Sequence, residues 1–393
     1  MRPYDVVVVG GGIAGASIGY ELAADRSVCL LERESTLALH TTGRSAATFI
    51  ESLGGSQIRG LTKSSRPFYE DPPETFTGPL LTPLPLLLTA PAGRADAVRE
   101  MHGQISALTP DVRLVGEAEA RRLNPLLRPG YPQLALLEPG AMEIDVHAVH
   151  QGYVRGIRQR DGAVHKSAGV VSATRAGAVW SVTDAAGETY QAPVVVNAAG
   201  AWVDEVARAA GARPIGIRPL LRTIFMVAAP SGMDLAGLPL TADVDETFYF
   251  KPEGAQLLCS PAEETLTPPS DAKPDETSIA RALDAINEVT MLNARHVRGS
   301  WAGLRSFAPD RNPVVGFDAE AEGFFWFAGQ GGFGIQTAPA LARLGAALLR
   351  RSDGTAGFAA DVTEGVATEI AGDMAANGVS VGQLAATRFS TAN

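Results

Sequence analysis

The sequence predicts a mixed α/β protein with two domains, a Rossmann-like dinucleotide-binding domain and an interleaved domain built on an antiparallel sheet. Three observations predict this. The chain opens with a strand, a glycine-rich turn, a helix and a second strand. Residues 214–260 alternate between apolar and polar side chains, as strands do, and a second glycine-rich turn precedes a helix expected from about Thr337. A chain of 393 residues has room for two domains.

The opening stretch, DVVVVGGGIAG from Asp5 to Gly15, is the strongest of these signals. Four consecutive valines are typical of a strand buried on both faces. Gly10, Gly12 and Gly15 are spaced for a tight turn, for close approach of a pyrophosphate and for close helix packing. A helix over 14–23 and a second strand over 28–31 follow, and Glu32 ends that strand, where a carboxylate binds ribose hydroxyls. The pattern predicts a cofactor that contains ADP, either FAD or NAD.

Composition excludes several classes of protein. The net charge of −10 argues against nucleic acid and anionic membranes as partners. Cys29 and Cys259 are the two cysteines, which predicts neither a disulfide framework nor a metal site. No export signal or membrane-span length of apolar residues is visible, since Pro83 and Pro85 interrupt the apolar run at 80–88. We therefore expect a cytoplasmic protein.

The middle of the chain supplies further elements. A helical then proline-rich stretch at 54–79 suggests a domain boundary, and surface helices are expected at 98–108 and 116–123. Asp145, His147 and His150 have a metal-ligand spacing, but we interpret Asp145 as the cap of a helix that runs to Ile157. Three strand-like runs follow over 169–192, then a buried strand over 193–196. A loop is expected at 262–277 and a helix at 279–292.

The second glycine-rich turn lies in the C-terminal third. Strand-like residues from Gly323 lead into GQGGFGIQ, and a helix is expected from about Thr337 to Arg350, with Pro339 in its first turn. An NAD-binding protein does not need a second glycine-rich helix start. A flavin does, because its isoalloxazine lies far from its ADP end and a helix N-terminus stabilises the reduced anion.

These stretches together resemble the D-amino-acid oxidase/glycine oxidase superfamily of FAD enzymes, most of all D-arginine dehydrogenase and similar bacterial D-amino-acid dehydrogenases. The matching segments are GGGIAGAS at 10–17, HTTGRSAA at 40–47, HQGYVRG at 150–156, VNAAGAW at 196–202, WAGLRSF at 301–307 and GGFGIQ at 331–336. The resemblance implies FAD held without a covalent link, in agreement with the lack of a cysteine in the C-terminal third. It also implies an FAD-binding domain of residues 1–79, 143–213 and 299–393, and a substrate-binding domain of 80–142 and 214–298.

The resemblance assigns roles to individual residues. Arg222, Tyr249 and Arg305 would bind a substrate carboxylate, and the carbonyl of Gly332 would orient the amine. The substrate pocket would include Thr48, Ile50, Leu53, Leu87 and Gln336. With the fingerprint, the residues expected to contact FAD are Gly10, Gly12, Ile13, Ala14, Gly15, Glu32, Arg33, Thr42, Gly43, Arg44, Ser45, Ala46, Ala47, Val171, Ala199, Gly200, Trp202, Gly303, Gly331, Gly332, Gly334, Ile335 and Gln336.

The pocket departs from the pattern of the D-arginine enzymes. Those enzymes carry a histidine, a tyrosine and an acid at the positions of Thr48, Leu53 and Leu87. None of these three residues can pair with a cationic side chain, so we expect apolar D-amino acids to be favoured over D-arginine.

The sequence as a whole therefore predicts FAD-dependent oxidative deamination. Hydride transfer from the substrate Cα to flavin N5 would give an imino acid, which water converts to a 2-oxo acid and ammonia. One alternative is oxidation of secondary amines such as N-methyl or cyclic amino acids. Two others, from different classes, are an NAD-binding dehydrogenase and a flavin-binding scaffold without turnover. The electron acceptor, whether oxygen, a quinone or another, is left open.

Overall fold

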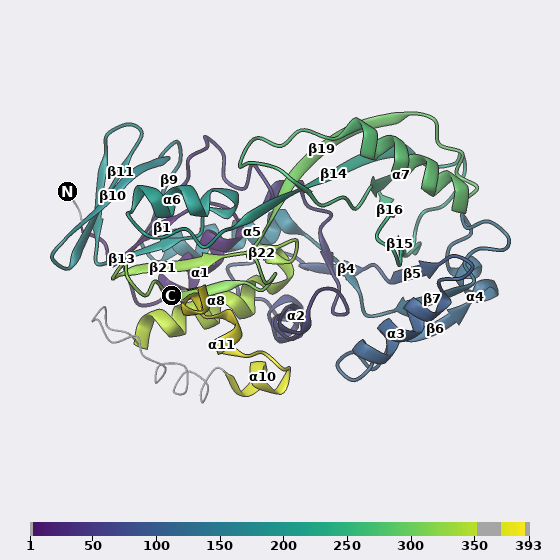
Figure 1. The fold of residues 1–393 in the computed structure, drawn as a ribbon, viewed down its shortest axis with the longest axis horizontal. Coiled ribbons are helices and arrows are strands. Elements are labelled where there is room, and N and C mark those ends of the chain that lie inside the picture. The colour runs from purple at the N-terminus through teal and green to yellow at the C-terminus, as the bar shows by residue number, and fades with distance from the viewer. Residues whose placement is uncertain (1–2, 352–370, 390–393) are drawn as a thin grey trace.

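The computed structural model describes residues 3–351 and 371–389. Two large sheets dominate it, with the N-terminal sheet at one end and the antiparallel sheet at the other (Figure 1). The first has six strands in the order β20 (Val314–Phe317), β21 (Phe324–Ala328), β13 (Val194–Asn197), β1 (Val6–Val9), β2 (Val28–Leu31) and β9 (Ala163–His165). All neighbouring pairs are parallel except β20 with β21.

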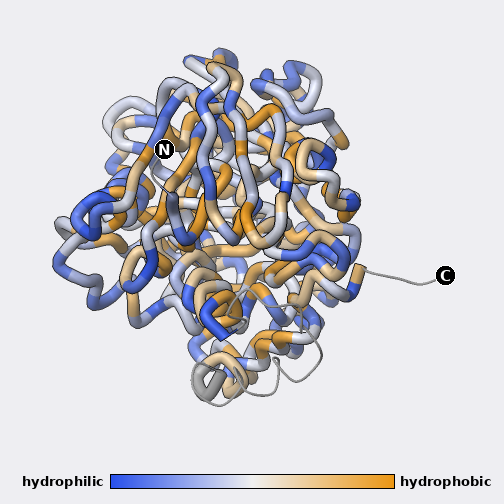
Figure 2. Tube along the Cα trace, turned by 90° about the vertical axis from the view of Figure 1, so that its left-hand side faces the viewer, coloured by the Kyte–Doolittle hydropathy of each residue, from blue (hydrophilic) through white to orange (hydrophobic). Residues whose placement is uncertain are grey.

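The central strand β1 is buried on both faces, as its run of valines predicts. Val6 and Val8 pack with helices α1 (Ile13–Leu22) and α8 (Gly334–Arg351). Val7 and Val9 face the opposite side, where the three-stranded meander β10 (Val170–Ala176), β11 (Val179–Asp184) and β12 (Thr189–Ala192) and helix α6 (Val203–Ala209) cover the sheet. Figure 2 shows hydrophobic residues, in orange, mainly toward the middle of the molecule and the more hydrophilic segments, in blue, mainly toward the periphery.

The second sheet has ten strands and is largely antiparallel. Its order is β22 (Gln330–Gly331), β19 (Val297–Phe307), β14 (Arg218–Ala228), β17 (Gln256–Ser260), β16 (Tyr249–Glu253), β15 (Leu240–Asp243), β5 (Leu86–Ala90), β7 (Leu134–Glu138) and β6 (Arg113–Gly116), with β18 (Thr265–Leu266) paired to β14. Helices α7 (Glu276–Val289), α3 (Ala95–Ile105) and α4 (Glu117–Leu123) pack on it.

Smaller elements complete the fold. They comprise β3 (Thr48–Phe49), β8 (Met142–Ile144) and β4 (Leu81–Pro83), which form a three-stranded sheet, with helices α2 (Ser56–Glu70), α5 (Val146–Gln159), α10 (Ala371–Ala376) and α11 (Val381–Leu384) and the short turns η1 (Thr42–Arg44), η2 (Gly200–Trp202) and η3 (Ala386–Phe389). The division into domains stays a prediction, and its expected boundary at residue 299 falls inside β19. Among the described residues, no helix combines the length and the apolar character needed to cross a membrane.

The start of α8 corrects one expectation. The helix begins at Gly334 rather than near Thr337, so Pro339 lies in its second turn. Proline has no N–H for the carbonyl of Ile335, four residues earlier. The buried Tyr69 hydroxyl donates to that carbonyl instead, and the Ala340 N–H donates to the Ser65 hydroxyl at 3.1 Å. Helix α2 thus supplies the hydrogen bonds that the proline disrupts, which is why α8 continues through it.

Candidate functional site

One cavity of about 1060 Å³ connects the two sheets. It is lined by the glycine turn after β1, by the turn before α8 and by one face of the ten-stranded sheet. Nearly all of the predicted site residues line it. The exceptions are Gly15, which follows the lining residue Ala14, Gly43, which lies between the lining residues Thr42 and Arg44, and Leu87.

At the β1 end, the backbone is arranged to leave helix α1 open toward the cavity. Gly12 has no side chain with which to cap the helix, and the Thr42 hydroxyl accepts from the Ile13 N–H at 3.0 Å. The positive end of the helix faces the cavity, which Gly12, Ile13 and Ala14 line. A Cβ on Gly10 would lie 2.4 Å from the Ala198 carbonyl oxygen, and one on Gly15 would lie 1.9 Å from that of Gly10. These contacts explain why the turn and the helix packing require glycine.

Two buried side chains hold this turn. Glu32 accepts hydrogen bonds from the N–H groups of Gly11 at 2.7 Å and Glu34 at 2.9 Å. His150 Nε2 lies 2.9 Å from the Gly11 carbonyl oxygen, and burial lowers the pKa of this histidine.

Asp145 caps α5 through the Ala148 N–H at 2.8 Å, as predicted. No group of three acidic, histidine or cysteine side chains suited to a metal occurs in residues 3–351 and 371–389.

Segment 41–45 connects this end of the cavity to β19. The Thr41 hydroxyl donates to the Leu304 carbonyl at 2.7 Å, and Arg44 donates to the Ala302 carbonyl at 3.0 Å. The Trp301 indole N–H donates in return to the Arg44 carbonyl at 3.2 Å. The loop of small and hydroxyl residues at 40–47 is therefore fixed along the cavity wall rather than being an ordinary surface loop.

The sheet face at the other end brings Arg222 and Arg305 together. Arg222 on β14 pairs with Gly303 on β19, so Arg305, two residues further on, is its diagonal neighbour on the same face. Tyr249 on β16 also lines the cavity. Gly332 packs directly against Arg305, since a Cβ there would lie 1.9 Å from Nε of that guanidinium.

Glu264 and Arg311 complete this cluster, and sequence reasoning missed both. Glu264 Oε1 lies 3.1 Å from Arg305 Nη1 and 3.6 Å from Arg222 Nη2. Arg311 grips both oxygens of the same carboxylate at 2.9 Å. Burial, and next the charge of Arg222, lower the pKa of Arg305 to about 10. Burial opposes ionisation of Glu264, but its hydrogen bond to Arg311 and the charges of the three arginines leave its pKa below the usual value.

Beside the arginines, the cavity wall is apolar. Leu86 and Leu240 pair across β5 and β15 and cluster with Ile50, while Leu53 and Tyr249 pack against them. Leu87 is a correction to the predicted pocket. Side chains alternate along a strand, so Leu87 points to the opposite face, into a core cluster with Val115 and Leu137, and Leu86 and Leu88 line the cavity instead.

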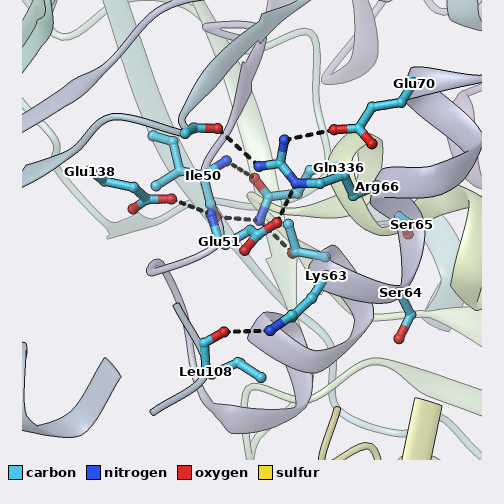
Figure 3. Close-up of polar contacts among 12 residues, drawn as sticks. Ile50, Glu51, Lys63, Ser64, Ser65, Arg66, Glu70, Leu108, Glu138 and Gln336 are labelled. Atoms are coloured by element: carbon cyan, nitrogen blue, oxygen red, sulfur yellow. Dashed lines mark hydrogen bonds and ion pairs between the residues drawn. The ribbon is translucent and has the colours of Figure 1, made fainter. Parts of the chain in front are cut away.

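Gln336 acts on the pocket through the backbone. Its buried amide accepts from the Ile50 N–H at 3.2 Å, donates to the Ile50 carbonyl at 3.3 Å and donates to Thr62 at 2.8 Å (Figure 3). Behind this segment, Glu138 accepts from the Glu51 N–H at 2.9 Å. The first turn of α8 therefore fixes the wall that carries Ile50.

Other charged residues that line the cavity were also missed, namely Arg59, Glu205, Asp243 and Glu246. Asp243 accepts a hydrogen bond from Thr247 at 2.7 Å, and Glu246 is exposed. The sequence carried only partial signals for the missed residues. The predicted loop at 262–277 is rich in acidic residues, and Arg311 lies in the segment DRNPVVG at 310–316, but nothing local shows that Glu264 and Arg311 reach the arginines of the sheet.

Comparison with known proteins gives concordant results. The model of the family described as DAO, FAD dependent oxidoreductase, matches residues 5–348. The chain is 26% identical over 392 residues to hydrogen cyanide synthase subunit HcnC of Pseudomonas aeruginosa, covering 86% of this chain and 90% of that protein. It is 25% identical over 366 residues to glycine oxidase of Geobacillus kaustophilus, covering 89% and 94%. The crystal structure of a glycine oxidase from that species superposes with a TM-score of 0.78 at 22% identity, covering 89% of this chain and 95% of the other. L-proline dehydrogenase from P. horikoshii also has a TM-score of 0.78, at 20% identity, covering 89% and 94%.

Proposed function

The chain belongs to the FAD dependent oxidoreductase family, and on that premise we propose that it oxidises the Cα–N bond of a D-amino acid with an apolar side chain. The observation that carries the proposal is the pair of guanidinium groups on one face of β14 and β19. Arg222 and Arg305 lie in the same cavity as the glycine turns, with Tyr249 beside them. Two guanidinium groups and a phenol are well suited to bind a carboxylate.

FAD is the cofactor, and the cavity fits it. The positive N-terminus of α1 and the exposed backbone at Gly12 suit a pyrophosphate. A Cβ on Gly12 would approach only the Thr42 hydroxyl, at 3.2 Å, and that hydroxyl accepts from the Ile13 N–H. The second helix start, at Gly334, adjoins Gly331 and Gly332, which line the cavity near Arg305. Gln330 presents a buried side-chain nitrogen there without a partner among the described residues. When bound, FAD supplies the hydride-accepting chemistry of the reaction.

The residues of this chain position the substrate. Arg222, Arg305 and Tyr249 hold the α-carboxylate, and the Gly332 carbonyl orients the amine, so that the Cα–H faces the second helix start. Holding two reacting groups at near-attack distance accounts for a large part of such a barrier. The amine reacts in its neutral form, so no side-chain base is needed. The imino acid formed is hydrolysed by water to a 2-oxo acid and ammonia.

The apolar wall supports the choice of side chain. Ile50, Leu53, Leu86 and Leu240 lie beside Tyr249, and burial of an apolar or aromatic side chain there contributes about 1.5–3 kcal/mol. A cationic side chain would incur a desolvation cost of several kcal/mol against the same wall unless an acid reached it. Asp243 is already hydrogen-bonded to Thr247.

The test is a panel of amino acids mixed anaerobically with the FAD-loaded protein, followed through the flavin absorbance. D-Leucine and D-phenylalanine should bleach the flavin with a higher kcat/KM than D-arginine or D-lysine, and their L-enantiomers should be inactive. A preference for D-arginine would contradict the assigned side chain, and faster bleaching by N-methyl or cyclic amino acids would replace the primary amine as substrate. Absence of bleaching by every member of the panel would reject the proposed function.

A further inference from the structure

Glu264 occupies the point at which the two sheet arginines converge. Its Oε1 lies within 3.1 Å of Arg305 and 3.6 Å of Arg222, and these arginine side chains are only 16% and 13% exposed. A substrate carboxylate held by the same two guanidinium groups needs this position. Two carboxylates cannot share it, because like charges at this distance repel strongly.

We propose that Glu264 is a resident carboxylate that takes the substrate's place on Arg222 and Arg305 and is displaced when the substrate binds, so that it sets the affinity of the site for carboxylates. The proposal rests on the carboxylate-binding role of these arginines in the proposed function.

The neighbours of Glu264 allow such an exchange. Arg311 holds both of its oxygens at 2.9 Å and is itself 53% exposed, so Glu264 can keep this partner while it leaves the buried pair. The preceding residue, Glu263, is fixed separately, because its carboxylate accepts from the Thr223 N–H at 2.7 Å and its carbonyl accepts from Arg222 Nε at 3.0 Å. Movement of the Glu264 side chain therefore leaves Arg222 anchored.

In the absence of substrate, the resident carboxylate of Glu264 stabilises the arrangement of the two arginines. Arg222 and Arg305 are like charges on diagonal positions of one sheet face, and Arg222 Nη2 is buried without a hydrogen bond among the described residues. Glu264 offsets this repulsion, and an arriving carboxylate takes over the same function. Removing the charge of Glu264 should therefore strengthen carboxylate binding, both by ending the competition and by leaving the arginines uncompensated.

The experiment is titration calorimetry on the oxidised, FAD-loaded protein. Two probes of equal shape are used, 4-methylpentanoate, which is leucine without its amine, and its neutral analogue 4-methylpentanamide. Glu264→Gln should tighten 4-methylpentanoate binding by about 10- to 100-fold, the value of one charged hydrogen-bonding partner, and leave the amide within about two-fold of wild type. Glu264→Asp retains the charge but is too short to reach Arg305 from Arg311, and should also tighten the carboxylate.

Glu322→Gln is the matched control. Glu322 does not line the cavity, and its carboxylate lies 2.6 Å from Arg175 Nη1. This variant should change neither dissociation constant. Weaker or unchanged carboxylate binding in both Glu264 variants would overturn the proposal, as would equal tightening of the amide. If neither wild type nor Glu264→Gln binds 4-methylpentanoate, the carboxylate-binding role of the arginines fails as well. Tightening in a protein that no amino acid bleaches would support the exchange and reject only the proposed reaction.

Discussion

Gly332 offers the sharpest test of the proposed site, because it packs against the guanidinium of Arg305. A Cβ added at this position would lie 1.9 Å from Nε, 2.1 Å from Nη2 and 2.3 Å from Cζ. Ordinary van der Waals contact begins at 3.4 Å, so in Gly332→Ala the guanidinium must move by about 1.5 Å. The rings of Phe307 and Phe333, each with its centroid 5.3 Å from Arg305 Cζ, limit the directions in which it can move.

A shift of this size should misplace the substrate carboxylate. A displacement of about 1 Å costs roughly 100-fold in rate, which corresponds to about 2.7 kcal/mol of transition-state stabilisation. We expect kcat/KM for D-leucine to fall by about 100-fold in Gly332→Ala, measured as the rate of anaerobic flavin bleaching against substrate concentration. Flavin content, read from the absorbance of the purified protein, should match wild type.

A double-mutant cycle identifies the cause of the loss. If the added methyl group acts through Arg305, Gly332→Ala should cost little further in an Arg305→Ala background, because the displaced group is already absent. Multiplicative losses in the double variant would show that Gly332 acts independently of Arg305. Full activity of Gly332→Ala would refute the geometry from which the prediction starts, and loss of flavin would place the effect at the cofactor instead.

Three further predictions follow from the same structure. Arg222→Ala should lower kcat/KM by about 30- to 1000-fold, with FAD still bound, because it removes a charged partner worth roughly 2–4 kcal/mol; unchanged steady-state kinetics would remove Arg222 from the site. Glu32→Ala and Gly12→Val should both reduce the flavin content of the purified protein, the valine more severely, and full occupancy in Gly12→Val would misplace the ADP end. Burial raises the pKa of Glu138, because the folded protein disfavours its ionised form. The protonated side chain contributes to stability at low pH, and this contribution is lost as pH rises through the raised pKa. Thermal unfolding should therefore show Glu138→Gln with a higher Tm than wild type at pH 7 and an equal Tm below the usual glutamate pKa of 4.5; a difference of the same size at both pH values would contradict this reasoning.

The features that sequence reasoning predicted correctly are those fixed by neighbours along the chain. The run Val6–Val9 required a strand covered on both faces, and Asp145 had the spacing of a helix cap that accepts from the Ala148 N–H. The strands of the meander over 169–192 followed from alternation and turn residues. In each case the deciding contact lies within a few residues or within a repeated pattern.

The errors concern residues whose role depends on the direction of a side chain or on a contact between distant segments. Leu87 was predicted to line the pocket, but a strand points successive side chains to opposite faces, so its neighbours Leu86 and Leu88 line the cavity and Leu87 does not. Glu264 lies in a loop that the sequence predicted, and its role depends on Arg305, 41 residues away on another strand. The sequence of a loop has no periodic pattern that would predict a contact with a distant strand.

His150 and Gln336 show what this means for the site as a whole. Both are buried polar side chains near the cavity, and each bonds the backbone of a cavity-lining segment, His150 at Gly11 and Gln336 at Ile50. Their partners are 139 and 286 residues away in the sequence. A buried polar group without its partner costs free energy, so each side chain favours one position of the segment that it holds. We predict that the cofactor binds at the glycine turn and a carboxylate at the arginines, and the segments that line these predicted sites are held by such long-range bonds, which local sequence patterns do not show.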